Sequence, residues 1–417
     1  MPHPKLLVAA LALAAAAPAA RAADDYFISI PAFGAVYRID GDSGAITPFA
    51  SGMSIPFYGT FAPDGNLYMP DRGLGVVWKI DPTGNVTPFA AGGWLTSLVT
   101  LTLAPGGGFV AADIFQETVV HIDETGQQTL IADAVSSGGL LSGPGGIGYG
   151  PDGTLYVANN MSNTLVKVDD QTGVVTPFTD AQGLLIQPAG VVVDNAGNLF
   201  VASYGTNEIV RVRLDTGLAS VFCTDPFMLH PNDVRLAPEG GLHVTVNNAA
   251  MVRIDAKGQL TLLHEEGVLG PWDGVASEAY LSPCSGEFVS YGAGLAGSGG
   301  VVPELRGIFA PCPGAHAGLE VVGLLGGSFG SLAWGLAPAS VPFKQGALLV
   351  SLGPPGGLIP LFFPGVGPGG GALTLSFTLP NTAALTGLSI YHQVLAADPG
   401  APAGISMTNG LEERIGS

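Results

Sequence analysis

Basic residues are scarce in this chain, which holds 14 Lys and Arg against 33 Asp and Glu and has a formal net charge of −19 at pH 7. Nucleic acid and anionic membrane surfaces attract clustered positive charge, so we expect neither as a partner. Long apolar runs are also missing from the C-terminal third, where glycine and proline interrupt each of them. A membrane-spanning helix takes about 20 apolar residues, so we expect no transmembrane segment after the N-terminus.

Cysteine is rare as well, with one residue at each of positions 223, 284 and 312. Cys284 and Cys312 can form a disulfide in an oxidising compartment, which would leave Cys223 unpaired; three buried free thiols are the alternative. Several catalytic motifs are missing: there is no GxSxG elbow near a suitable strand, no HExxH and no Cys-x-x-Cys. These absences argue against a serine hydrolase and a zinc peptidase.

The N-terminus has the pattern of a secretory signal peptide over residues 1–22. A short segment with Lys5 precedes an apolar run at about 6–17, and the small-residue pattern Ala-Arg-Ala follows at 20–22. We expect cleavage before Ala23 and a secreted protein, either extracellular or periplasmic. A retained or lipid-linked anchor is the alternative.

A short motif recurs every 40 to 46 residues: a basic residue or histidine, an apolar residue and an aspartate that opens a turn usually ending in glycine. The six aspartates are Asp40, Asp81, Asp123, Asp169, Asp215 and Asp255. Hairpin turns use an aspartate that hydrogen-bonds its own turn and a glycine at positive φ. We therefore interpret the row as six hairpins rather than as a metal-binding array.

A second hairpin precedes each motif, as in APDGNLYMPD and GPDGTLYVANN, and an inner strand precedes that hairpin, as in GGIGYG and AGVVVD. Four strands in about 43 residues match the strand number and the length of a propeller blade. The first copy lacks an inner strand, and the orphan segment GPWDGVAS at 270–277 supplies one. The sequence thus predicts an all-β fold with a closed six-bladed β-propeller over residues 23–281, in which this segment pairs with the strand near Asp25.

Residues 284–417 differ in composition and predict a second, glycine-rich domain. Short apolar runs such as LEVVGLL, GALLVSL and GALTLSFTL alternate with Gly/Pro turns, which is typical of a β-sandwich-like domain. Low-complexity disorder is the alternative, although the apolar content is too high for a solvated linker. The pattern resembles the C-terminal domains of large exported bacterial proteins, and this resemblance implies association with the cell surface.

The repeats resemble the NHL and gluconolactonase/regucalcin-like propellers, above all in QPAGVVVDNAGNLFVASYGTNEIVRV. Virginiamycin B lyases share this style of repeat, but their Leu-Trp-Phe-Thr-Glu strand is absent. HPNDVRLA and PWDGVAS are similar to the inner strands that carry metal ligands in the gluconolactonase-like family, which implies Asn232 and Asp273 as ligands of a divalent cation, usually calcium. Other ligand positions of the family are replaced by residues such as Ala189 and Tyr58, so no cofactor is certain and any calcium binding would be weak.

The starts of the inner strands converge on the propeller channel and combine aromatic with polar side chains, which suits a small-molecule, carbohydrate or protein ligand. We expect four residues to contact such a ligand: Tyr58, Trp94, Asn232 and Trp272. Blade packing is the alternative role of the aromatic residues.

The first hypothesis is therefore a binding or scaffolding module without chemistry. The alternative is a lactone or ester hydrolase that uses a divalent cation, with Asp273 and His230 as catalytic residues. A lyase similar to virginiamycin B lyase is the second alternative.

Overall fold

The computed structural model describes residues 25–41, 43–237, 240–247, 250–265, 274–276, 285–401 and 403–416. The predicted signal peptide lies outside these residues. The chain divides into two compact units, with a boundary between residues 283 and 284. Both consist of β-strands, and no helix in the described ranges is long and apolar enough to cross a membrane. The short 3-10 segments are η1 (Pro31–Phe33), η2 (Ala181–Gly183), η4 (Ser298–Gly300) and η5 (Ala383–Leu385).

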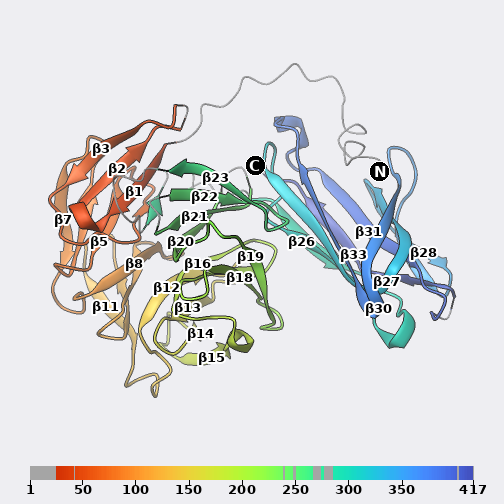
Figure 1. The fold of residues 1–417 in the computed structure, drawn as a ribbon, viewed down its shortest axis with the longest axis horizontal. Helices are drawn as coiled ribbons and strands as arrows, with labels where there is room; N and C mark the ends of the chain where they lie inside the picture. Colours follow the sequence, from red (N-terminus) through yellow and green to blue (C-terminus); the bar gives the residue numbers. More distant parts are fainter. Residues whose placement is uncertain are drawn as a thin grey trace. The chain divides into compact units, whose positions relative to one another are not determined.

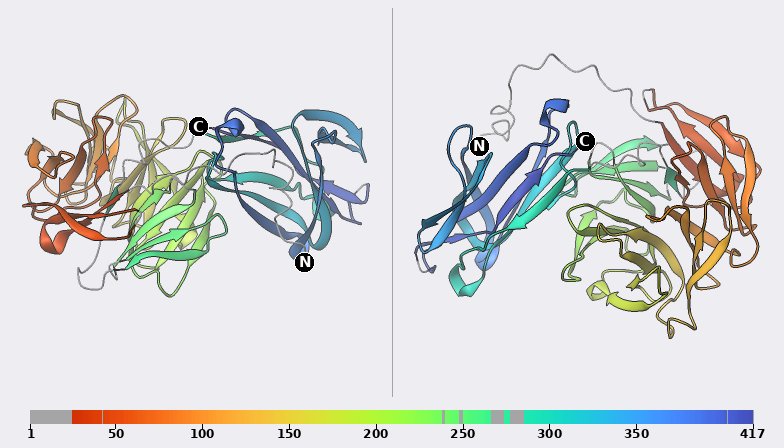
Figure 2. Two further views of the ribbon diagram at one scale, coloured as in Figure 1. Left: turned by 90° about the horizontal axis from the view of Figure 1, so that it is seen from above. Right: turned by 180° about the vertical axis from the view of Figure 1, so that it is seen from behind.

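Six antiparallel sheets of four strands make up the first unit, which confirms the six-bladed β-propeller. The blades follow one another around one axis, from red through green in Figures 1 and 2, and inner strands of successive blades contact each other. From the inner to the outer strand, blade 1 consists of β24 (Val275–Ala276), β1 (Tyr26–Ile30), β2 (Ala35–Ile39) and β3 (Ile46–Ser51), and blade 2 consists of β4 (Thr60–Phe61), β5 (Leu67–Asp71), β6 (Val76–Ile80) and β7 (Val86–Ala91). In the same order, blade 3 consists of β8 (Leu98–Leu103), β9 (Phe109–Asp113), β10 (Thr118–Ile122) and β11 (Gln128–Asp133), and blade 4 consists of β12 (Pro144–Tyr149), β13 (Leu155–Asn159), β14 (Thr164–Val168) and β15 (Val175–Thr179). Blade 5 consists of β16 (Pro188–Val193), β17 (Asn198–Ser203), β18 (Glu208–Arg213) and β19 (Ala219–Thr224), and blade 6 consists of β20 (Pro231–Leu236), β21 (Leu242–Val246), β22 (Ala250–Ile254) and β23 (Leu260–Glu265).

The ring closes in blade 1, where β24 pairs antiparallel with β1 and Val275 lies opposite Ile28. The predicted closure is therefore confirmed in the described part of this segment. Ser29 adds a further link, because its Oγ accepts a hydrogen bond from Gly274 N–H at 2.9 Å and donates one to Phe57 O at 2.9 Å. The pairing with β24 covers the inner edge of β1, where another chain could otherwise add a strand.

The repeated aspartates form local turns, as the sequence predicts. In five of these turns the carboxylate accepts a hydrogen bond from a backbone N–H a few residues further on, as between Asp81 and Thr83 at 2.8 Å. The same kind of bond forms at Asp40, Asp123, Asp169 and Asp255. Asp215 pairs with Arg213 instead. The repeated aspartates therefore stabilise local turns and do not form a metal-binding array.

The glycine that ends each turn packs against the preceding blade. Gly126 has φ +87°, and a Cβ added to it would overlap the carbonyl oxygen of Phe89 on β7. Aromatic residues at equivalent places in the second strands fill the same joints, with the rings of Tyr68 and Phe109 4.5 Å apart between blades 2 and 3. These aromatics are buried in the core and do not face the channel.

The second unit is built on one main sheet. Within the described residues its neighbouring strands are β25 (Glu287–Tyr291), β33 (Gly410–Arg414), β31 (Ser389–Ala397), β27 (His316–Gly335) and β26 (Glu304–Ile308). Three further pairings complete the unit: β30 (Gly357–Thr378) with β27, β32 (Ile405–Met407) with β31, and the separate hairpin β28 (Pro338–Phe343) with β29 (Gly346–Val350).

The long strand β27 passes through two layers of this unit. Its pairing with β30 shifts in a glycine-rich stretch between Val321 and Ser328, and such bulges bend a strand. One half of β27 therefore pairs with β26 and the other half with β31. Apolar side chains of both layers, such as Leu319 and Val394, share one core. The sheet thus folds over itself, so β-structure and not low-complexity disorder forms this domain.

The cysteines fall into two kinds. Cys223 is a free and buried thiol in blade 5, and burial raises its pKa to about 12. Cys312 is disulfide-bonded. Its predicted partner, Cys284, lies outside the described residues.

Candidate functional site

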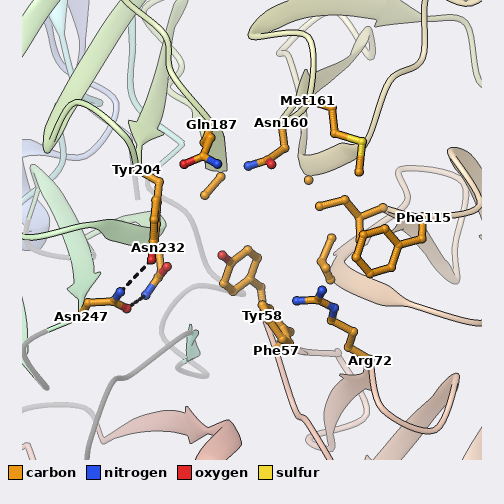
Figure 3. Close-up of a pocket in the computed structure, with 14 residues that line it drawn as sticks. Phe57, Tyr58, Arg72, Phe115, Asn160, Met161, Gln187, Tyr204, Asn232 and Asn247 are labelled. Atoms are coloured by element: carbon orange, nitrogen blue, oxygen red, sulfur yellow. Dashed lines mark hydrogen bonds between the residues drawn. The ribbon is translucent and has the colours of Figure 1, made fainter.

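A cavity of about 460 Å³ lies where the inner strands of blades 2 to 6 begin (Figure 3). Two repeated positions of the blades supply most of its lining. The starts of the inner strands contribute Phe57, Tyr58, Val99, Gly145, Ala189 and Asn232. The first residues after the second strands contribute Arg72, Ile114, Asn160, Tyr204 and Asn247. The propeller repeat therefore builds this cavity from equivalent places in successive blades.

Buried polar residues at the ends of the second strands hold the rim in place. Asp71 is fully buried and accepts hydrogen bonds from the backbone N–H groups of Ser54 at 2.7 Å and Ile55 at 2.9 Å, which precede the inner strand. Burial by itself raises the pKa of Asp71, but these N–H donors outweigh it and the net pKa lies below the ordinary value. In blades 3, 4 and 5 the corresponding side chains accept hydrogen bonds from backbone N–H groups of the loops that precede the inner strands; they are Asp113, Asn159 and Ser203.

One wall of the cavity is a chain of hydrogen-bonded polar side chains from blades 5 and 6. Asn232 Nδ2 donates to Asn247 Oδ1 at 2.8 Å, and Asn247 Nδ2 donates to the hydroxyl of Tyr204 at 3.0 Å (Figure 3). The ring of His230 stacks on Tyr204 with centroids 4.5 Å apart, and its Nδ1 lies 3.1 Å from the Tyr204 carbonyl oxygen. These bonds fix the orientation of the side chains before any ligand binds.

The other wall is apolar and carries one cation. The guanidinium of Arg72 lies over the rings of Phe57, 5.4 Å from the centroid, and Phe115, 4.9 Å from the centroid. Ile114 and Met161 continue this wall. Of the described residues that line the cavity, Arg72 alone is charged. The cavity is therefore amphipathic, with a cation beside apolar surface and carboxamides opposite.

A buried ion pair lies on the inner strand of blade 6. Arg235 Nε is 3.0 Å from the Asp233 carboxylate, which also accepts the Val275 N–H of blade 1 at 3.2 Å. Arg235 Nη2 donates to Gly59 O, which precedes the inner strand of blade 2, at 3.3 Å. Burial raises the pKa of Asp233, and the charge of Arg235 opposes that rise. The pair links three blades across the closure and does not line the cavity.

The predicted ligand-binding residues have different outcomes. Tyr58 and Asn232 line the cavity. Trp94 does not line this cavity: it lies on the loop after the outer strand β7, is 44% exposed, and its backbone N–H donates to Gln128 Oε1 on the outer strand β11. Its contact with a ligand stays a prediction. Trp272 lies outside the described residues.

The two predicted catalytic residues do not form a described site. His230 is exposed and reaches the cavity only by stacking on Tyr204. Asp273 lies outside the described residues. The strand register places Val275 opposite Ile28, as Val191 lies opposite Val201 and Val234 opposite Val244, so Gly274 shares the repeat position of Gly190 and Asp233.

The described residues do not fit the calcium site that the resemblance implies. Calcium takes six to eight oxygen ligands, usually with several carboxylates. Among the described residues no cluster of three or more His, Cys, Asp or Glu could hold a metal, and the polar groups of the cavity are carboxamides and hydroxyls apart from Arg72. In the second unit, a GxSxG match at 326–330 lies inside β27 and not at a strand-to-helix turn, so it is no nucleophile elbow.

Three cavity residues that the sequence did not predict share one position in the repeat. Arg72, Tyr204 and Asn247 each follow a second strand directly, as in YMPDR, FVASY and HVTVN. No short motif marks them, but the repeat alignment places them at equivalent positions one residue beyond the buried strand. An alignment of these ends would have indicated that they share one rim.

No family model matches the sequence, and no curated protein matches it. Solved structures with a similar fold include a chain of a nidogen/laminin complex, at 16% identity and a TM-score of 0.52 over 61% of this chain and 97% of that one. They also include a virginiamycin B lyase from Staphylococcus aureus, at 15% identity and a TM-score of 0.47 over 63% and 94%. A gluconolactonase from Xanthomonas campestris has 16% identity and a TM-score of 0.49 over 63% and 90%.

The chain of the nidogen/laminin complex is similar to this protein at the level of the fold. At such identities the likeness concerns the fold alone, because one propeller fold hosts many functions.

Proposed function

We propose that this protein is an exported binding module whose propeller holds a small polar ligand in the mouth cavity. The observation that carries the proposal is the pairing of a pre-ordered carboxamide wall with an apolar, cationic wall in a cavity of about 460 Å³. Ligand sites in proteins occupy about 300–1,000 Å³ and combine apolar lining with a few fixed polar groups.

Binding without chemistry is the better fit to the described groups. General acid–base catalysis needs a titratable group within hydrogen-bond reach of the substrate, typically histidine or a carboxylate. Neither type lines the cavity among the described residues. Carboxamides such as Asn160 and Asn232 orient a ligand but neither gain nor lose a proton near neutral pH, so they cannot act as general acids or bases.

A cavity-filling variant tests the proposal. Ala189 lines the cavity, and Ala189→Trp would fill much of it. Affinity selection of a small-molecule library with detection by mass spectrometry should retain compounds on the wild-type protein and lose them on this variant. Val135→Trp is the matched control, because Val135 is 89% exposed and outside the cavity. Retention of the same compounds by Ala189→Trp, or of none by the wild type, would reject the proposal.

Export to an oxidising compartment is part of the same proposal. The signal-like N-terminus and the disulfide at Cys312 support it, since disulfides persist mainly outside the cytosol. N-terminal sequencing of the protein recovered from its native host should begin at Ala23. A mature chain that retains Met1 would contradict export by cleavage.

A further inference from the structure

Arg72 is a cation without an anionic partner among the residues that the structure describes. Its guanidinium forms no ion pair or hydrogen bond with the described residues, and its side-chain contacts are the rings of Phe57 and Phe115. Three other arginines of the propeller form ion pairs, Arg38 with Asp25, Arg213 with Asp215 and Arg235 with Asp233. An unpaired guanidinium that lines a cavity is an available site for a negatively charged group.

The adjacent carboxylate cannot take that role. Asp71 precedes Arg72 in the chain, but its two oxygens accept hydrogen bonds from the backbone N–H groups of the lead-in loop and of Gly73. Trp78 Nε1 donates to the same carboxylate at 3.0 Å. The hydrogen bonds to Asp71 thus engage the carboxylate that adjoins Arg72 in the chain, and the guanidinium stays available to a ligand.

The two phenyl rings also orient the guanidinium. They lie 5.4 and 4.9 Å from its central carbon, and the N–H groups of a guanidinium match the two oxygens of a carboxylate. Figure 3 shows the Arg72 guanidinium directed toward the centre of the cavity, between Tyr58 and Phe115. A pre-oriented side chain loses less conformational entropy when it binds.

The rest of the cavity limits the ligand further. The chain has a net charge of −19, so its overall field repels anions and only local, well-matched contacts can hold one. Apolar surface at Ile114 and Met161 adjoins the cation, and the amides of Asn160 and Asn232 belong to the same cavity. A ligand that satisfies all three has an anionic head, an apolar part and hydrogen-bonding groups.

We infer that the mouth cavity binds a small organic carboxylate, whose carboxylate pairs with Arg72 while its apolar part lies on the adjoining wall. This inference rests on the proposed function and adds the chemical class of the ligand. Arg72 is then the specificity-determining residue, because a neutral analogue would leave its guanidinium without an acceptor.

Matched probes test the inference on the mature protein. The probes are 4-hydroxybenzoate, N-acetyltyrosine and N-acetylglutamate, each compared with its carboxamide by isothermal titration. At least one carboxylate should bind tenfold or more tightly than its amide. Arg72→Gln should remove that preference, and Arg72→Lys should weaken carboxylate binding several-fold, because an ammonium lacks the planar fork. Lys257→Gln is the control, since it removes the same charge from an exposed turn.

Two outcomes would overturn the inference: no probe carboxylate binds at millimolar concentration, or the amides bind as tightly as the acids. Amide binding that Ala189→Trp abolishes would leave the proposed function intact while rejecting the anion site. The NMR signal of the Arg72 Nε–H needs no variant and should shift when the bound carboxylate is added to the wild type. A signal that does not move while the carboxylate binds would also contradict the role of Arg72.

Discussion

At the scale of single residues, a buried carboxylate explains how one side of the cavity stays in place. Asp71 is fully buried and binds the loop that leads into the inner strand of blade 2. Its neighbour Arg72 is thereby held at the rim. A charged group is tolerated there because several N–H donors replace the water that burial removes.

Asp71→Asn should destabilise the propeller by about 3 kcal/mol at pH 7, because the amide cannot accept all of these hydrogen bonds. The folded pKa of Asp71 lies below its unfolded value, so its contribution is complete above about pH 4 and is lost as the pH falls through the folded pKa. Urea unfolding at pH 7 and pH 3 should therefore show a smaller difference between wild type and variant at the lower pH. Glu124→Gln, at an exposed position, is the control. An equal difference at both pH values would contradict this role.

The sequence predicted only part of the cavity. Tyr58 and Asn232 were found because they begin inner strands, and inner strands converge on the channel. Arg72 was missed because its direction depends on the buried aspartate before it and on two rings from separate loops, none of which forms a local pattern. Trp94 does not line this cavity because its loop follows the outer strand β7, whereas an aromatic residue near a strand start resembles a rim residue in the sequence.

At the scale of elements, the turns between the third and outer strands join neighbouring blades. The repeated glycine has positive φ for its turn and also lies against a backbone carbonyl of the preceding blade, as at Gly126. Both requirements act on one residue, so the glycine is needed for the joint as well as for the hairpin.

A pair of glycine substitutions separates these two requirements. Gly153→Ala, at φ +81° with no atom near the added Cβ, should cost about 1 kcal/mol from the backbone conformation alone. Gly126→Ala adds the overlap with Phe89 O and should cost about 3 kcal/mol. Chemical denaturation of both variants checks the difference. Equal costs would show that the blades move apart without penalty.

The elements of the propeller were predictable because each blade repeats the same local chemistry. Alternating apolar strands, Asp-Gly turns and the strand order all follow from one motif. The second unit has no repeat, and its bend depends on a register shift inside β27 that becomes visible only when β30 pairs with it. The β class of this unit could be predicted, but not the way its sheet folds over.

At the scale of the whole molecule, closure depends on contacts between residues far apart in the sequence. Ser29 binds Gly274 in its own blade and Phe57 in the lead-in to blade 2, and the Asp233 side chain binds Val275. These bonds join the two ends of the repeat array, which a linear array would leave exposed.

Ser29→Ala should destabilise the propeller by about 2 kcal/mol, because it leaves a buried N–H and a partly buried carbonyl without this partner. Ser162→Ala is the matched control, since it removes an exposed hydroxyl that bonds only locally. Hydrogen exchange followed by mass spectrometry should show faster exchange in β1 for the first variant only. Unchanged exchange in β1 would show that closure does not depend on this link.

The central claim is that the mouth of the propeller is a ligand-binding site. A crystallographic fragment screen of the mature protein tests it most directly, because it records where small molecules bind without assuming their identity. We predict that fragments concentrate in the cavity of Tyr58, Arg72 and Asn232, and that acidic fragments place a carboxylate within hydrogen-bond distance of Arg72. Fragments that bind elsewhere on the chain and leave this cavity empty would contradict the claim.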